Sequence, residues 1–153
     1  MSFHNGSGGT VQVVADLAGF YGPGDGFQPE TPTRVLDTRN GTGAAKAALG
    51  AGSRLPLNLS CKVPAGTRAV VLNVTVTGPQ AAGYLTVYPD AAAPPGTSNL
   101  NFARGETIAN QVIVPLSNGI ADFYNGSPGT VQVVADLTGY YGTGPRPRTA
   151  SSP

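Results

Sequence analysis

The sequence predicts an all-β protein: an antiparallel β-sandwich, Ig-like or jelly-roll-like, with essentially no helix. Three observations support this class. Hydrophobic residues make up 40% of the 153 residues and gather in short Val/Leu/Ile runs. Turn-forming residues, among them 22 Gly and 14 Pro, separate these runs, as in sandwiches and barrels. No segment has the 3.6-residue period of an amphipathic helix.

The runs place eight strands along the chain, at residues 34–38, 54–59, 69–77, 83–88, 98–102, 111–116, 120–124 and 130–140. Residues 70–77 alternate apolar with more polar side chains, so their odd-numbered side should face solvent. The remaining strands extend the same pattern. The expected core comprises Val35, Leu36, Val70, Leu72, Val74, Val76, Leu85, Val87, Leu100, Val112, Val114, Leu116, Val131, Val133 and Ala135.

An internal repeat organises the chain. Residues 3–22, FHNGSGGTVQVVADLAGFYG, return at residues 123–142 as FYNGSPGTVQVVADLTGYYG, with sixteen of twenty positions identical at an offset of 120. An offset of this length indicates whole domains in series rather than a short solenoid repeat. We therefore expect residues 1–22 to be the closing hairpin of a preceding repeat or a donor-strand segment. Residues 23–26 would be a linker, residues 27–142 a complete module and residues 143–153 a flexible Pro-rich tail.

Four separated blocks carry a family resemblance: FQPETPTRVLDTRNGTG, AVVLNVTVTGPQAAGYLTVYP, SNLNFARGETIANQVIVPL and YNGSPGTVQVVADLTGYYG. In these blocks the chain resembles the roughly 120-residue extracellular β-sandwich repeat modules of actinobacteria. The resemblance implies a secreted or cell-surface bacterial protein with a structural, adhesive or carbohydrate-binding role. It supplies no catalytic residues.

Composition argues against several classes of protein. A net charge of +1 gives no basic field for nucleic acid. No apolar stretch is long enough to span a membrane as a helix. One Cys and one His cannot build a Cys/His metal cluster, and the acidic residues are scattered. We expect no cofactor and no metal ion. The first residues lack the features of a signal peptide, and we expect that such a peptide was removed.

Possible catalytic groups have structural interpretations. Asp37 begins Asp-Thr-Arg rather than the Asp-Thr-Gly of aspartic proteases, and the motif occurs once, although that chemistry needs two carboxylates. We expect Asp37 to bond loop amides or to pair with Arg34 or Arg39. Asp16 and Asp136 should form Asx-type turns at strand ends.

Two further residues are candidates for a nucleophilic site. His4 has Tyr124 as its repeat counterpart, which suggests that the position needs a ring rather than a base. Cys61 should be a buried or half-buried apolar filler. No catalytic residue is expected, and the chain is predicted not to be an enzyme.

Two functions remain open. The first is a structural or interaction module of a tandem array, a stalk or a self-assembling subunit whose partners are neighbouring copies. Its assembly strand would use Thr10, Val11, Val13, Ala15 and Leu17, which can pair within the chain, enter another copy or stay unpaired. The alternative is a lectin-like module for cell-wall or surface glycan, with Tyr84, Tyr88, Asn99 and Asn101 as ligand contacts.

Overall fold

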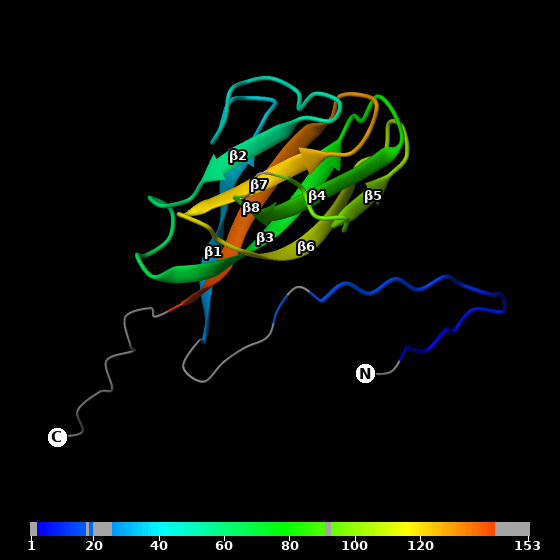
Figure 1. The fold of residues 1–153 in the computed structure, drawn as a ribbon, viewed down its shortest axis with the longest axis horizontal. Coiled ribbons are helices and arrows are strands. Elements are labelled where there is room, and N and C mark those ends of the chain that lie inside the picture. The colour runs from blue at the N-terminus through cyan, green and yellow to red at the C-terminus, as the bar shows by residue number, and fades with distance from the viewer. Residues whose placement is uncertain (1–2, 18, 20–25, 91–92, 143–153) are drawn as a thin grey trace.

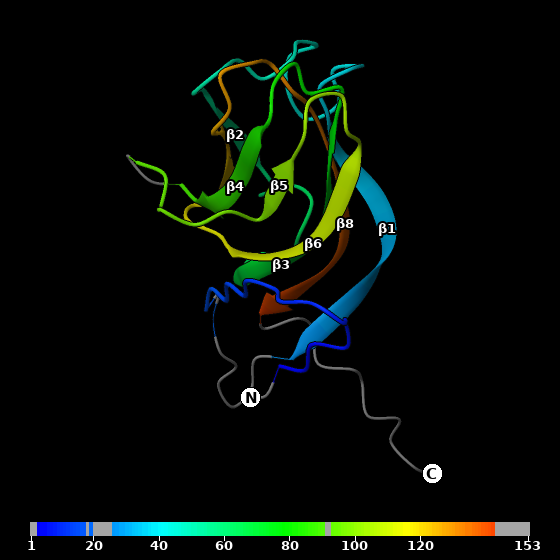
Figure 2. The ribbon, with the colours of Figure 1, turned by 90° about the vertical axis from the view of Figure 1, so that its right-hand side faces the viewer.

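Two four-stranded antiparallel sheets pack face to face in the computed structural model, which describes residues 3–17, 19, 26–90 and 93–142 (Figures 1 and 2). The strands are β1 (Phe27–Asp37), β2 (Arg54–Asn58), β3 (Thr67–Thr77), β4 (Gly83–Pro89), β5 (Leu100–Phe102), β6 (Ile108–Pro115), β7 (Ile120–Asn125) and β8 (Gln132–Gly142). The described residues contain no helix, and therefore none that could cross a membrane. The all-β sandwich predicted from the sequence is confirmed.

The strand order defines the topology. One sheet has the order β1-β8-β3-β6 and the other β2-β7-β4-β5. The first strand thus pairs with the last, the second with the seventh, the third with the sixth and the fourth with the fifth. This is the connectivity of an eight-stranded jelly roll. The sequence left an Ig-like and a jelly-roll-like sandwich open, and the structure is jelly-roll-like.

Strand β1 begins seven residues earlier than the sequence predicts, at Phe27 instead of Arg34. Pro29 and Pro32 lie in this added part, and proline breaks a ladder in the middle of a sheet. It is tolerated here because β1 is an edge strand that pairs only with β8. The other seven strands lie within three residues of their expected bounds.

The core lies between the sheets and contains the expected residues except Leu116, which is only partly buried at its edge. The expectation that the odd-numbered side of β3 faces solvent is wrong at Val71, which is 3% exposed. Its cross-strand neighbours are Ile113 and Gly139, and the ring of Phe27 lies where a side chain of Gly139 would project. These apolar groups cover Val71 on the outer face.

A bulge in β8 changes which side chains face the core. Leu72 lies opposite Leu137 and Val71 opposite Gly139, which leaves Thr138 as the extra residue. An extra residue reverses the alternation of the residues that follow it. Leu137 and Tyr140 are therefore both buried, although one number is odd and the other even.

Candidate functional site

Residues 5–9 reproduce one turn of the sandwich outside it. In the turn between β7 and β8, the backbone N–H and the hydroxyl of Ser127 donate to Asn125 Oδ1 over 3.0 and 2.7 Å, and Asn125 Nδ2 donates to the carbonyl of Gly129 over 2.8 Å. Ser7 donates in the same two ways to Asn5 Oδ1, over 2.9 and 2.7 Å. Asn5 Nδ2 donates to the carbonyl of Gly9 over 2.7 Å. The repeat thus has the same turn geometry as well as the same sequence.

The two copies differ in what surrounds them. Val131, Val133 and Leu137 of the second copy are at most 4% exposed. Their counterparts Val11, Val13 and Leu17 are 54%, 57% and 90% exposed. The proposed assembly residues, including Thr10 and Ala15, are all exposed and lie outside any strand. This segment is therefore an apolar strand sequence without a sheet.

The outer face of the sheet β2-β7-β4-β5 brings two tyrosines together. Tyr84 is 36% exposed, and its ring centroid lies 6.3 Å from that of Tyr124. A Cβ on Gly126 would lie 2.1 Å from Cζ of Tyr84, so the ring rests on the backbone of the turn after β7. Asn101 is exposed and pairs across the sheet with Tyr84.

An ion-pair cluster adjoins these rings on the same face. Arg54, opposite Tyr124 in the β2–β7 pairing, donates from Nη1 to Asp122 Oδ2 over 3.0 Å. The same nitrogen lies 3.6 Å from an oxygen of Asp90. Asp122 is fully buried, whereas the side chains of Arg54 and Asp90 are 42% and 33% exposed. We call Arg54, Tyr84, Asp90, Asn101 and Tyr124 the tyrosine face; it offers rings beside hydrogen-bonding groups of both charges.

The other two predicted ligand residues lie differently. Tyr88 is 3% exposed; burial, followed by the charge of Asp122, raises the pKa of its hydroxyl, and Arg54 opposes this. Asn99 Oδ1 accepts the N–H of Val87 over 2.7 Å, and so joins the β4–β5 loop to β4. The structure thus brings Tyr84 and Asn101 together at the surface and places Tyr88 beneath it.

Sequence reasoning missed Arg54 and Asp122 as members of this region. A usable signal existed, because each is polar or aromatic and alternates with core residues in its strand. The cross-strand register that joins β2, β7 and β4 could not be read from the chain.

The hydrogen bonds of the turn after β1 account for the burial of Asp37. Its carboxylate is 1% exposed and accepts the backbone N–H and side-chain Nε and Nη2 of Arg39 over 3.0, 2.9 and 2.8 Å. Arg34 Nη1 donates to it over 3.1 Å. The bonds from Arg39 hold the pKa of Asp37 far below its usual range, although burial opposes them. The expected pairing and amide bonding are confirmed.

Two expectations for individual side chains are wrong. Asp136 does not form a turn at a strand end, because β8 continues to Gly142; instead it accepts a hydrogen bond of 2.5 Å from Arg34 Nε. Cys61 is exposed, not buried, because it lies in a surface turn after Leu59, whose carbonyl accepts the N–H of Lys62. His4 is exposed in the N-terminal segment. Asp16 is exposed there too.

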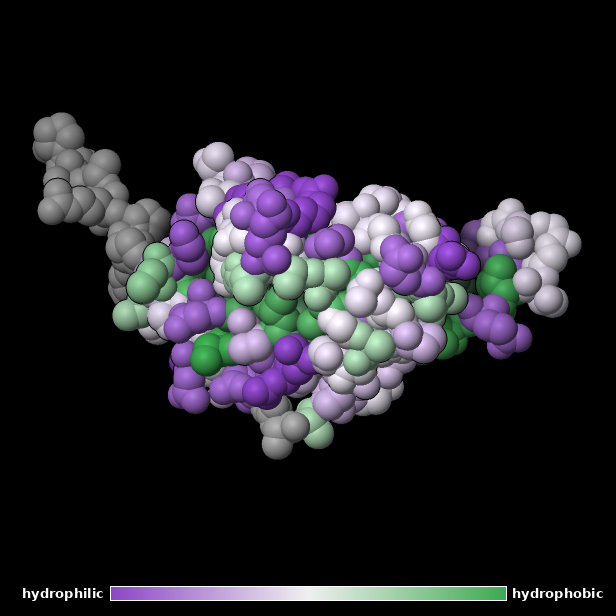
Figure 3. Space-filling model, turned by 90° about the horizontal axis from the view of Figure 1, so that it is seen from above, coloured by the Kyte–Doolittle hydropathy of each residue, from purple (hydrophilic) through white to green (hydrophobic). Residues whose placement is uncertain are grey.

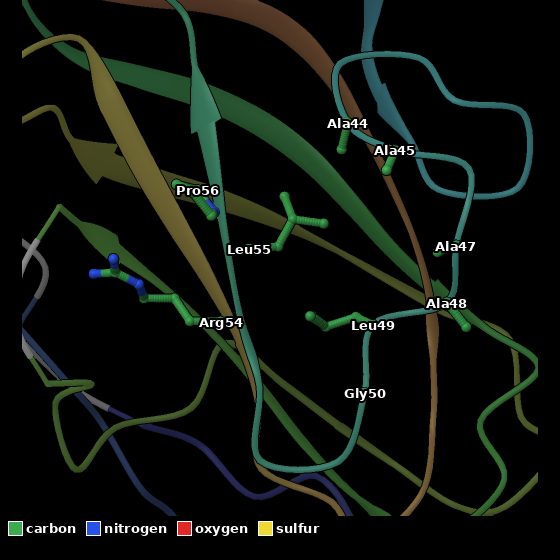
Figure 4. Close-up of a pocket in the computed structure, with 9 residues that line it drawn as sticks. All are labelled: Ala44, Ala45, Ala47, Ala48, Leu49, Gly50, Arg54, Leu55 and Pro56. Atoms are coloured by element: carbon green, nitrogen blue, oxygen red, sulfur yellow. The ribbon is translucent and has the colours of Figure 1, made fainter.

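A shallow apolar hollow lies between the loop after β1 and the edge of β2, with a volume of about 350 Å³. Its lining comprises Ala44, Ala45, Ala47, Ala48, Leu49, Gly50, Arg54, Leu55 and Pro56. Leu49 and Leu55 point into it and Arg54 points away (Figure 4). Apart from Arg54, the lining is apolar, and the hollow therefore presents no reactive group.

The surface seen from above carries a hydrophobic band between hydrophilic clusters (Figure 3).

Among the described residues, no three His, Cys, Asp or Glu side chains gather as metal ligands would. Comparison with protein-family models, with curated proteins and with solved structures finds no match for this chain.

Proposed function

We propose that this chain belongs to a tandem array of non-catalytic β-sandwich modules, which acts as a stalk or spacer outside the cell. Residues 3–17 would be the end of the closing hairpin of a preceding module, and residues 27–142 the following module. The observation that carries the proposal is the repeated turn, in which Asn5, Ser7 and Gly9 make the hydrogen bonds of Asn125, Ser127 and Gly129. Extracellular location rests on the family resemblance.

The burial contrast supports the same interpretation. A strand sequence that alternates apolar side chains is stable only when one face is covered. Residues 11, 13 and 17 repeat the core residues Val131, Val133 and Leu137 but are more than half exposed. An upstream sandwich with the same neighbours would bury them.

The proposed lack of catalytic function is supported by the way in which two buried carboxylates of the described residues are held. Asp37 and Asp122 are each held by arginines. His4, the one histidine of the chain, lies exposed in the N-terminal segment. Neither carboxylate is therefore available as an unengaged base beside a nucleophile.

A two-module chain tests the proposal. Residues 27–122 are placed directly before residues 3–153, so that residues 3–22 can complete the added sandwich. The amides of residues 10–17 should exchange on the order of 100-fold more slowly than in the original chain, because they would join a sheet ladder. Small-angle X-ray scattering should show two modules in an elongated particle. Unchanged exchange of residues 10–17 would contradict the array.

Carbohydrate binding is the second candidate, favoured by the tyrosine face. Tyr84 and Tyr124 present rings beside the half-exposed Arg54 and Asp90, and sugars are bound by rings together with hydrogen-bonding groups. A glycan array with the purified chain, repeated with Tyr84→Ala, tests this. Phe27→Ala is the matched control, because Phe27 is an exposed ring on the other sheet. Sugar binding that survives Tyr84→Ala would rule out this face.

A further inference from the structure

The chain contains two copies of one strand but a single place for it. Residues 10–17 and 130–137 have the same sequence, TVQVVADL. Residues 132–137 of the second copy are the first part of β8 and lie in the slot between β1 and β3, and Val131 before them pairs with Leu49. We propose that residues 10–17 are a second occupant of this slot, which they fill within the same chain when β8 is weakened. The inference shares with the proposed function the view that residues 10–17 are a closing strand.

The slot recognises its strand through groups that both copies carry. Val133 and Ala135 of β8, and Val131 just before it, are at most 1% exposed. Their counterparts in the first copy are Val11, Val13 and Ala15. The same side chains would fill the same space, so neither a cavity nor a clash arises.

Polar contacts at the slot are also matched. Arg34 of β1 donates to Asp136 over 2.5 Å, and Thr38 Oγ1 donates to Gln132 Oε1 over 2.5 Å. The first copy supplies the same two acceptors as Asp16 and Gln12. Arg34 and Thr38 could therefore donate the same hydrogen bonds to either copy.

Chain direction and loop length allow the first copy to reach the slot. β8 runs antiparallel to β1, which is also the direction of a strand that enters β1 through a short hairpin. Phe27 pairs with Tyr141, whose repeat counterpart is residue 21. Pairing of residue 21 with Phe27 would leave residues 22–26 as the connection, a five-residue loop within the usual range for hairpins.

The free edge of β1 is a poorer site for the same segment. Residues 29–34 of β1 are exposed, so a strand added there would leave Leu17 outside the core. Pro29 and Pro32 also lack the N–H groups that such pairing uses. Burial and hydrogen bonding both favour the slot over the edge.

Two features explain why β8 holds the slot in the structure. In the turn that joins it to β7, Asn125 and Ser127 are buried, and Asn125 Nδ2 donates to the carbonyls of Leu49 and Gly50 over 3.2 and 2.9 Å. Thr138 Oγ1 donates to the carbonyl of Val71 over 3.2 Å, and the first copy has alanine at this place. The first copy therefore enters only when β8 is impaired.

Aspartate substitutions in the full chain test the inference. Val133→Asp puts a charge at a fully buried position of β8, which expels that strand. We expect the variant to remain a cooperatively folding monomer with a lowered denaturation midpoint. Its residues 10–17 should gain amide protection and residues 130–137 should lose it. Val13→Asp alone should leave the midpoint unchanged, and the double variant Val13→Asp/Val133→Asp should be unfolded.

Val74→Asp is the matched control, because Val74 is equally buried in β3 and the offset of 120 gives it no second copy. It should unfold with or without Val13→Asp. The inference is overturned if Val133→Asp is as unfolded as the double variant, if it folds without protection of residues 10–17, or if it folds only as a dimer. The two-module chain keeps every β8 intact, so its success or failure is independent of this result.

Discussion

At the scale of single residues, Asp37 shows how a carboxylate can be buried in a protein with few charges. Five donor atoms from Arg34, Arg39 and Asn40 surround its two oxygens. Loss of the negative charge would remove the carboxylate that Arg34 and Arg39 share, although Arg34 would keep its ion pair with Asp136. The residue that resembles a protease motif is therefore a structural anchor between β1 and its turn.

Asp37→Asn should lower the free energy of unfolding by about 2 kcal/mol at pH 7, because charge-assisted hydrogen bonds are replaced by weaker ones. The pKa of Asp37 in the folded protein is lowered from its ordinary value of 3.8. Its contribution is thus complete above that value and is lost as the pH falls below about 4. Denaturant unfolding of the original protein and of Asp37→Asn between pH 2 and 7 should show that the difference between their free energies of unfolding becomes smaller at the acid end.

Asp90→Asn is the control for this measurement, since Asp90 is one-third exposed and 3.6 Å from its arginine. Its effect should be below about 0.5 kcal/mol. If the loss of unfolding free energy in Asp37→Asn stayed constant down to pH 2, the charge of Asp37 would not be the cause of that loss.

At the scale of elements, the turn after β1 depends on a glycine that approaches another backbone. Gly43 has a φ of 71°, and a Cβ there would lie 2.0 Å from the carbonyl oxygen of Val35. Gly78, after β3, has a φ of 60° but nothing within 4 Å of its Cβ position. Both glycines have a positive φ, but only Gly43 has other atoms close to its Cβ position.

Gly43→Ala should therefore cost at least about 3 kcal/mol, from conformation and steric overlap together. Gly78→Ala should cost about 1 kcal/mol, from conformation alone. Thermal or chemical unfolding of the two variants measures the difference. Equal losses would show that the turn moves freely to accept the methyl group.

At the scale of the whole molecule, the jelly-roll pairing sets the first strand beside the last. In an array, the end of each closing strand would then lie near the start of its own module, and a short linker would lead to the next. Residues 10–17 expose apolar side chains and lie outside any strand, and such a segment is a template for association between copies.

Deletion of residues 1–22 should leave a folded monomer whose unfolding midpoint matches that of the full chain, because Val11, Val13 and Leu17 are exposed and stabilise nothing. The full chain should associate with rising concentration, and the truncated chain should not. Sedimentation velocity over a range of concentrations checks this. Failure of the truncated chain to fold would place residues 1–22 inside the sandwich.

The sequence by itself determined the fold class, the position of eight strands and nearly all of the core, because these follow from local alternation and from turn residues. It also identified the repeat and the partners of Asp37, which lie close along the chain. The tertiary structure alone decided the jelly-roll order, the bulge at Thr138 that turns Tyr140 inward, and the meeting of Arg54 with Asp122. Each depends on pairing between strands far apart in sequence, for which a local pattern contains no register.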